Sequence, residues 1–258
     1  MIDRRQETDP AIARRVARIV AAVRRSGDPA VLRYARRFDH LTAPAEVSRD
    51  EIQAGLRAID PSLRAALRTS ATHIRRIARR QVPRAWRTAI VSGVEIEQRV
   101  SPLDRVGCYV PAGRYPLPSS LLMTAIPAQV AGVPEIIVAC PRPDPTVLAA
   151  AAIANVTRLF RLGGAQAIAA LAYGTDTVPK VDKIVGPGSA YVAAAKALVA
   201  TDCPIDFYAG PTEIVLVATR GNPAWIAADL IAQAEHDPDA RGIVITTDRA
   251  LAHRIIEQ

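Results

Sequence analysis

The segment "LGGAQAIAALAYGTDTVPKVDKIVGPGSAYVAAAK", residues 162–196, decides which fold this chain is expected to adopt. Twice it places glycines directly before an alanine-rich helical stretch, and the β-branched run "KIV" precedes the second set of glycines. The flanking sequence repeats this rhythm, with "EIIVAC" and "TVLAAAAIANV" before the segment and "EIVLVAT" and "GIVITT" after it. Short strands alternating with helices predict an α/β fold in which helices cover a parallel sheet.

The first hundred residues instead predict helices with clear start signals. Asp9-Pro10, Asp28-Pro29 and Asp60-Pro61 each place an acid at an expected N-cap before a first-turn proline. The stretch "AIVSGVEIEQRVSPLDRVGCYV" then predicts extended structure that leads into the alternating region. Domain boundaries are therefore expected near residue 105 and near residues 209–211.

Composition places the chain among globular proteins. Its 258 residues are 50% hydrophobic and 22% charged. The longest apolar run, "VLAAAAIANV", is too short to span a bilayer, and the N-terminus has no signal-peptide pattern. Cys108, Cys140 and Cys203 are widely spaced and odd in number, which favours a reducing compartment over a disulfide framework. We predict a cytoplasmic protein that makes no membrane contact.

The net charge of +8 is concentrated in residues 1–100, which hold 21 arginines against 11 acidic residues. A basic half raises nucleic acid as a partner. However, these arginines are spaced as solvated faces of amphipathic helices, with few aromatic residues between them. We therefore predict no nucleic-acid binding. A basic nucleic-acid-binding protein that borrowed this domain is kept as an alternative, and its binding would weaken steeply with salt.

The three lysines, unlike the arginines, are clustered at Lys180, Lys183 and Lys196. Either these positions need a compact ammonium group rather than a planar guanidinium, or the clustering is chance. The two strand–glycine–helix junctions suit a phosphate or a dinucleotide, because glycines allow close approach and a helix N-terminus offers free N–H groups. Neither junction is GxGxxG, and a tight turn between strand and helix explains the same pattern.

Two loops could contribute further ligand contacts. "GCYVPAGRYPLPSS", residues 107–120, carries Tyr109 and Tyr115, which could form a base-stacking wall; a surface loop is the alternative. "DFYAGPTEIVLV", residues 206–217, places Thr212 and Glu213 where a turn enters a strand, and a hydroxyl there could hold a substrate or cap the turn.

The stretch "DLIAQAEHDPDA", residues 229–240, places Gln233 and His236 one helical turn apart. That spacing suits two ligands converging on one metal ion, although a zinc site needs about four ligands. Glutamine is an uncommon ligand, and a histidine is also favourable at a helix C-terminus, where it faces the helix dipole. On spacing alone, both interpretations stay open.

Four motifs together carry a resemblance. "RVGCYVPAG", the segment at residues 162–196, "AGPTEI" and "AADLIAQAEHDPDA" occur in this order and at these spacings. On these motifs the chain resembles the histidinol dehydrogenase family from about residue 8 to its end. The resemblance implies oxidation of the small molecule L-histidinol to L-histidine through the aldehyde, with NAD and Zn2+ as cofactors, in a homodimer.

The resemblance also implies a domain plan and a set of site residues. Incomplete Rossmann-like domains would follow an N-terminal helical segment: residues 106–211 would form the NAD-binding domain, while residues 1–105 and 212–258 would belong to the other domain. NAD contacts would fall on Tyr109, Gln166 and Ser189. Substrate contacts would fall on Thr212, Gln233 and His236, of which Gln233 and His236 would also be zinc ligands.

Departures from the family pattern are informative. Ala112 stands in place of a usual glycine, Ser189 in place of asparagine, and Thr212 in place of serine. The family's glutamate–histidine pair of catalytic bases and its other two zinc ligands have no counterpart up to Gln258. We therefore expect a C-terminally truncated chain with no activity alone. The alternatives are a related dehydrogenase of another small alcohol and a non-catalytic NAD-binding module completed by a partner chain.

Overall fold

The computed structural model describes residues 9–112, 115–207, 213–236 and 240–258. The chain divides into two compact units, residues 1–208 and residues 209–258. The predicted α/β class is confirmed, because parallel strands alternate with helices in both units. The predicted division between residues 1–105 and 106–211 stays a prediction, as does the joining of residues 1–105 with residues 212–258.

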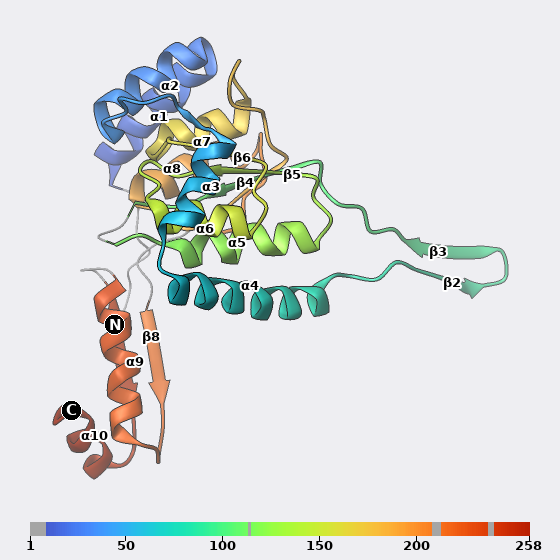
Figure 1. The fold of residues 1–258 in the computed structure, drawn as a ribbon. Helices are drawn as coiled ribbons and strands as arrows, with labels where there is room; N and C mark the ends of the chain where they lie inside the picture. The colour runs from blue at the N-terminus through green and yellow to red at the C-terminus, as the bar shows by residue number, and fades with distance from the viewer. Residues whose placement is uncertain (1–8, 113–114, 208–212, 237–239) are drawn as a thin grey trace. The chain divides into compact units, whose positions relative to one another are not determined.

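The first unit is built around a five-stranded sheet (Figure 1). Its strands are β1 (Glu46–Val47), β4 (Arg105–Tyr109), β5 (Glu135–Ala139), β6 (Arg158–Phe160) and β7 (Lys183–Val185). They lie in the order β1-β6-β5-β4-β7, with β4 to β7 mutually parallel and β1 antiparallel to β6. Counting from β4, this is the strand order 3-2-1-4 of a doubly wound sheet.

Helices cover both faces of this sheet, as Figure 1 shows. On one side, α7 (Gly164–Tyr173) and α8 (Ala190–Val199) share a core with the sheet, and α1 (Pro10–Ser26) and α2 (Asp28–Tyr34) pack on these helices. On the other side, α5 (Pro118–Val130) and α6 (Pro145–Ile153) share a core with the sheet, and α3 (Arg49–Ala58) and α4 (Pro61–Gln81) pack on these helices.

Alternation along the central strand explains how both faces are buried. In β5, Ile137 and Ala139 join the core under α7, while Ile136 and Val138 join the core under α5 and α6. Successive strand side chains point to opposite faces, so a strand covered on both sides is apolar throughout. The run "EIIVAC" therefore suits a central position in the sheet.

The helix start signals are local, and the structure confirms two of the three as N-caps. Asp9 accepts a hydrogen bond from the Ala11 N–H at 2.8 Å, and Asp60 accepts one from the Ser62 N–H at 2.7 Å. The third expectation is wrong in detail. Asp28 lies in the first turn of α2, whose N-cap is Gly27, because α1 ends at that glycine and α2 begins at once.

The sheet extends one step beyond β7. Ile184 donates its N–H to the Pro204 oxygen at 2.9 Å and accepts a hydrogen bond from the Asp206 N–H at 3.1 Å, and Ile184 and Ile205 form a parallel bridge. Residues 204–206 thus run parallel to β7 at its free edge. This pairing brings Asp206 to the carboxyl end of β7.

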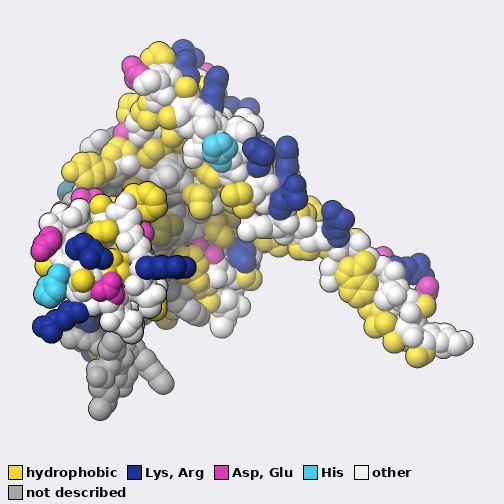
Figure 2. All heavy atoms as spheres, turned by 90° about the horizontal axis from the view of Figure 1, so that it is seen from below, with side chains coloured by type: hydrophobic (Ala, Val, Ile, Leu, Met, Phe, Trp, Pro, Cys, Tyr) yellow, Lys and Arg dark blue, Asp and Glu magenta, His cyan; other side chains and the backbone are white. Residues whose placement is uncertain are grey.

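The extended region before β4 forms a hairpin of β2 (Trp86–Val91) and β3 (Val94–Gln98). Every residue of both strands is exposed, including Trp86, Ile90 and Ile96. Figure 2 shows yellow hydrophobic side chains on the surface of this hairpin. An isolated two-stranded hairpin is marginally stable in water, so its apolar side chains are available for contact with further protein.

The second unit holds a parallel pair, β8 (Glu213–Val217) and β9 (Arg241–Ile245), with α9 (Pro223–His236) and α10 (Arg249–Ile256). Its small core gathers Ala227, Leu251 and Ile255. None of the helices in the described parts of the chain has the length and apolar character needed to cross a membrane.

Candidate functional site

The candidate site lies at the carboxyl ends of β4 and β7. These strands are neighbours, but the chain leaves β4 toward β5 on one side of the sheet and later places β7 on the other side. Such a reversal of strand order is a topological switch point, and ligands of open α/β sheets bind outside the strand ends there. Tyr109 ends β4, and Gly186 directly follows β7.

Tyr109 is buried at this switch point and is hydrogen-bonded to the start of a neighbouring helix. Its side chain is 4% exposed, and its hydroxyl oxygen accepts a hydrogen bond from the Gly164 N–H at 3.0 Å. Burial raises the pKa of the Tyr109 phenol above its ordinary value, so it stays neutral at physiological pH. The hydroxyl ties β4 to the N-terminus of α7, which begins at Gly164 with φ +58.

Gln166 lies in the first turn of α7 and is 1% exposed. Its Nε2 donates to Asp39 Oδ2 at 3.0 Å, and the Gly163 N–H donates to the same oxygen at 3.0 Å. Tyr109 and Gln166, predicted from the sequence, are thus brought to the same helix N-terminus. Asp39 fixes the amide group of Gln166.

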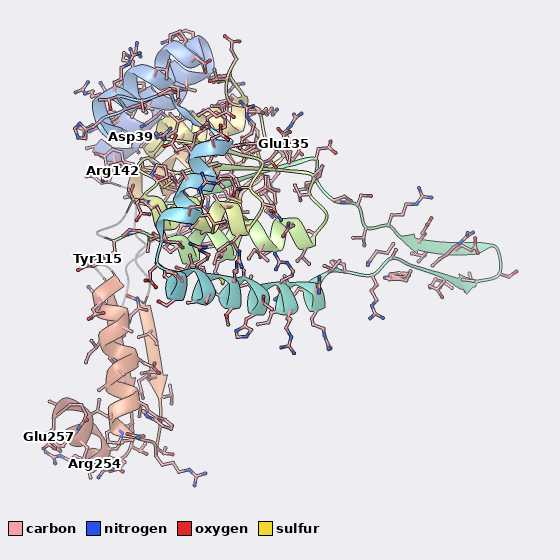
Figure 3. The ribbon with its side chains drawn as sticks, viewed as in Figure 1. Asp39, Tyr115, Glu135, Arg142, Arg254 and Glu257 are labelled. Carbon is pink, nitrogen blue, oxygen red and sulfur yellow. The ribbon has the colours of Figure 1, made fainter. Side chains whose placement is uncertain are left out.

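The analysis of the sequence missed Asp39. It is the last residue of the π-helix η1 (Ala35–Asp39), 127 positions from Gln166. Burial raises its pKa, while the hydrogen bonds from Gly163 and Gln166 and the charge of Arg142 act in the opposite direction. Figure 3 shows Asp39 and Arg142 close together, at the end of β5 away from Glu135. No local pattern around Asp39 marks it, because its partners are all distant in sequence.

Ser189 is the N-cap residue of α8 and is exposed. Its side chain makes no capping hydrogen bond, so the hydroxyl is left available to a ligand at the helix N-terminus. The loop before it, Gly186-Pro187-Gly188, is constrained. Gly186 has φ +115, and a Cβ atom there would lie 2.2 Å from the backbone oxygen of Tyr109. The Ser189 loop and Tyr109 therefore adjoin through Gly186.

The remaining predicted residues belong to the second unit or to undescribed positions. Gln233 is half-buried in α9, and His236 is the last residue of that helix, one turn further on. Thr212 lies outside the described residues, as does the side chain of His236. Within the described ranges, no three His, Cys, Asp or Glu side chains form a group able to hold a metal.

The structure also describes three other features singled out in the sequence: Tyr115, the lysine cluster and the cysteines. Tyr115 is 78% exposed. Lys196 is fully buried, whereas Lys180 is exposed and Lys183 is half-buried. The three cysteines are buried and unpaired, as expected without a disulfide framework.

The fold defines the class: an α/β protein whose parallel sheet has a topological switch point, the place where open sheets of this kind bind ligands. The model of the family "Histidinol dehydrogenase" matches residues 2–258. The histidinol dehydrogenase of Methylococcus capsulatus is 49% identical over an alignment of 254 residues that covers 95% of this chain and 58% of that protein. That of Aromatoleum aromaticum is 50% identical over 249 residues, covering 93% and 57% of the two chains.

A solved structure agrees. The crystal structure of histidinol dehydrogenase from Elizabethkingia anophelis superimposes with a TM-score of 0.91 at 33% identity, over 100% of this chain and 60% of that one. The chain belongs to the histidinol dehydrogenase family, a family of oxidoreductases. It spans less than two thirds of the length of these relatives.

Proposed function

We propose that this chain takes part in the zinc- and NAD-dependent oxidation of L-histidinol to L-histidine, and that residues 1–258 carry its dinucleotide-binding part. One observation carries the proposal: the switch point of the sheet gathers Tyr109, Gln166 and the Ser189 loop at adjacent strand and helix ends. The family relationship supplies the reaction.

The residues at this edge suit a dinucleotide. Gly186 lets backbone pass against Tyr109 where a side chain would collide, which leaves the loop's peptide groups close to a ligand. The N-terminus of α8, where the Ser189 side chain makes no capping bond, offers N–H groups for phosphate oxygens. Tyr109 holds the N-terminus of α7 through its hydroxyl, Ser189 adds an exposed hydroxyl, and Asp39 orients the Gln166 amide.

Fewer residues of this chain support the zinc site than support the dinucleotide site. Gln233 and His236 lie one turn apart on α9, and a tetrahedral zinc site takes about four ligands. We propose that these two residues, with Thr212, face the substrate. The other ligands and the bases would come from the part of the relatives' length that this chain does not match.

When bound, NAD supplies the hydride acceptor and Zn2+ a Lewis acid toward the alcohol oxygen. The chain's own contribution is to bind and orient. Tyr109 is neutral at physiological pH and adds no charge to the site, and burial raises its pKa further. Gln166 is locked by Asp39 and offers a fixed amide.

A homodimer of the whole protein completes the proposal. The β2–β3 hairpin supports it, since Trp86, Ile90, Val91 and Ile96 are all exposed on an element that buries none of its residues. Sedimentation of the parent chain and of a variant carrying both Ile90→Ser and Ile96→Ser tests whether the hairpin takes part in self-association. We expect the parent to associate more strongly than the variant. A parent chain that is monomeric at every concentration contradicts a role for these side chains.

Two measurements test the proposed function. Calorimetry with NAD+ is expected to show saturable binding to the 258-residue chain. Absorbance of NADH, with L-histidinol, NAD+ and Zn2+ present, is expected to show no turnover. Absence of NAD+ binding contradicts the dinucleotide role, and histidinol-dependent NADH formation contradicts the expectation that the bases lie elsewhere. A related small alcohol oxidised in place of histidinol by a longer form would favour the alternative dehydrogenase.

A further inference from the structure

Lys196 is a buried charge in the middle of α8. The residue is 0% exposed, and Lys196 and Gln166 are the two buried polar or charged residues among those that the structure describes. Burying an ammonium group is costly unless it is paired and hydrogen-bonded. The partner of Lys196 is Asp206, which arrives at the end of the segment added beside β7.

The two side chains together bind the backbone of one residue, Gly186. Lys196 Nζ donates to the Gly186 oxygen at 3.0 Å and forms an ion pair with Asp206 Oδ1. Asp206 Oδ2 accepts from the Gly186 N–H at 2.7 Å, and its Oδ1 accepts from the Phe207 N–H at 2.7 Å. Both polar groups of Gly186 are therefore bound, one by each member of the pair.

The conformation of Gly186 is one that other residues rarely adopt. Its φ of +115 and its approach to the Tyr109 oxygen leave no room for a side chain. Glycine also has the greatest backbone freedom, so fixing its conformation costs more conformational entropy than fixing that of any other residue. Bonds to both its N–H and its C=O restrict that freedom.

An ion pair is not needed here for stability. Replacing a buried pair by well-packed apolar residues is often neutral or stabilising, whereas removing one partner is destabilising. What the pair supplies is geometry, because a compact ammonium reaches a carbonyl and a carboxylate at once. A planar guanidinium has a different shape and a longer reach. This accounts for a lysine in a chain whose other cations are almost all arginine.

We propose that Lys196 and Asp206 are positioning residues that fix the backbone of Gly186, and through it the Gly186-Pro187-Gly188 loop and Ser189, in the conformation that receives the dinucleotide. This rests on the proposed function for the ligand's identity. The pair acts through the loop and carries no net charge, so it contributes order and not electrostatic attraction.

The test compares Lys196→Met, Asp206→Asn and the double variant with the parent chain. Lys196→Met alone leaves Asp206 without its cation and is expected to lower the midpoint of urea unfolding. The double variant is expected to recover most of that loss, since no unpaired charge remains. The control is Arg105→Met with Glu135→Gln, an exposed pair at the opposite end of the strands.

Two readouts on the double variant separate positioning from a purely structural role. In the unliganded protein, amides of residues 186–192 are expected to exchange with deuterium about tenfold faster than in the parent, while peptides of β5 and α6 are unchanged. The Kd for NAD+ is expected to rise by a similar factor of about ten, which means weaker binding. The control pair changes neither quantity.

Unchanged exchange at residues 186–192 in the double variant overturns the positioning role. Faster exchange with an unchanged Kd overturns the link to the ligand. If the parent chain itself does not bind NAD+, the proposed function fails, but the exchange measurement still decides whether the pair holds the loop.

Discussion

A Cβ atom on Gly186 would lie 2.2 Å from the backbone oxygen of Tyr109. The two residues sit at the carboxyl ends of adjacent parallel strands, in continuation of the pairing of Cys108 with Val185. Because real Cβ atoms do not approach an oxygen so closely, one strand end can sit against the other only with glycine at this position. The shape of the candidate site therefore depends on this contact.

Gly186→Ala is expected to be severely destabilising, by more than about 3 kcal/mol, because the methyl group collides with backbone and the positive φ is strained. Gly93→Ala is the matched control. Gly93 also has a positive φ, +81, but nothing lies within 4 Å of its added Cβ, so at most about 1–2 kcal/mol is expected there. Urea unfolding of both variants measures the difference, and equal costs would contradict the collision.

Tyr109→Phe removes the oxygen that accepts from the Gly164 N–H. The expected cost is about 1 kcal/mol of unfolding free energy, together with weaker NAD+ binding. Tyr34→Phe serves as the control, since Tyr34 stacks on Phe38 through its ring and should be nearly neutral. Thermal unfolding and calorimetry follow the two effects. A Tyr109→Phe variant as stable as the parent would show that the hydroxyl bond contributes nothing.

The raised pKa of Asp39 predicts a pH dependence with a definite sign. Burial is the main cause, so the folded state favours the protonated carboxyl, and stability is lost as pH rises through the folded pKa. Asp39→Asn removes that loss while keeping an oxygen for Gly163 and Gln166. The stability of Asp39→Asn relative to the parent is therefore expected to increase from pH 4 to pH 7 in urea titrations.

Asp60 supplies the opposite sign as a control. Its hydrogen bonds with Ser62 are the main cause of a lowered pKa, so its contribution is present above the unfolded pKa and is lost as pH falls through the folded value. Asp60→Asn should lose stability relative to the parent as pH rises. The same trend in both variants would refute the assignment for Asp39.

The cysteines are expected to be unreactive in the folded chain. Burial raises the pKa of Cys108 and Cys140 to about 12 and that of Cys203 to about 11, and the thiolate is the reactive form. A disulfide reagent at pH 8 should label none of them until guanidinium is added, and should then label three. Rapid labelling of any one of them without denaturant would show that its burial is wrong.

How far the sequence predicts this structure depends on the range of each interaction. The starts of α1 and α4 follow from Asp9 and Asp60, whose bonds close within two residues. The glycines before α7 and α8 predict junctions of strand and helix for the same reason. These elements and the α/β class could therefore be predicted.

Contacts between distant segments could not be predicted in this way. Asp39 meets Gln166 across 127 positions, and this depends on where α2 and η1 pack over the sheet. Asp206 meets Gly186 because residues 204–206 add to the free edge of β7, in a stretch with no strand pattern of its own. The lysine cluster hinted at Lys196, but only the fold shows that it is the buried member.

The most direct test of the central claim, that the switch point binds NAD, is a hydrogen-exchange map of the 258-residue chain with and without saturating NAD+. The account predicts slower exchange in three separate peptides, around residues 107–112, 163–168 and 186–192, and no change in the β2–β3 hairpin. Binding that protects other segments and leaves these three unchanged would contradict it.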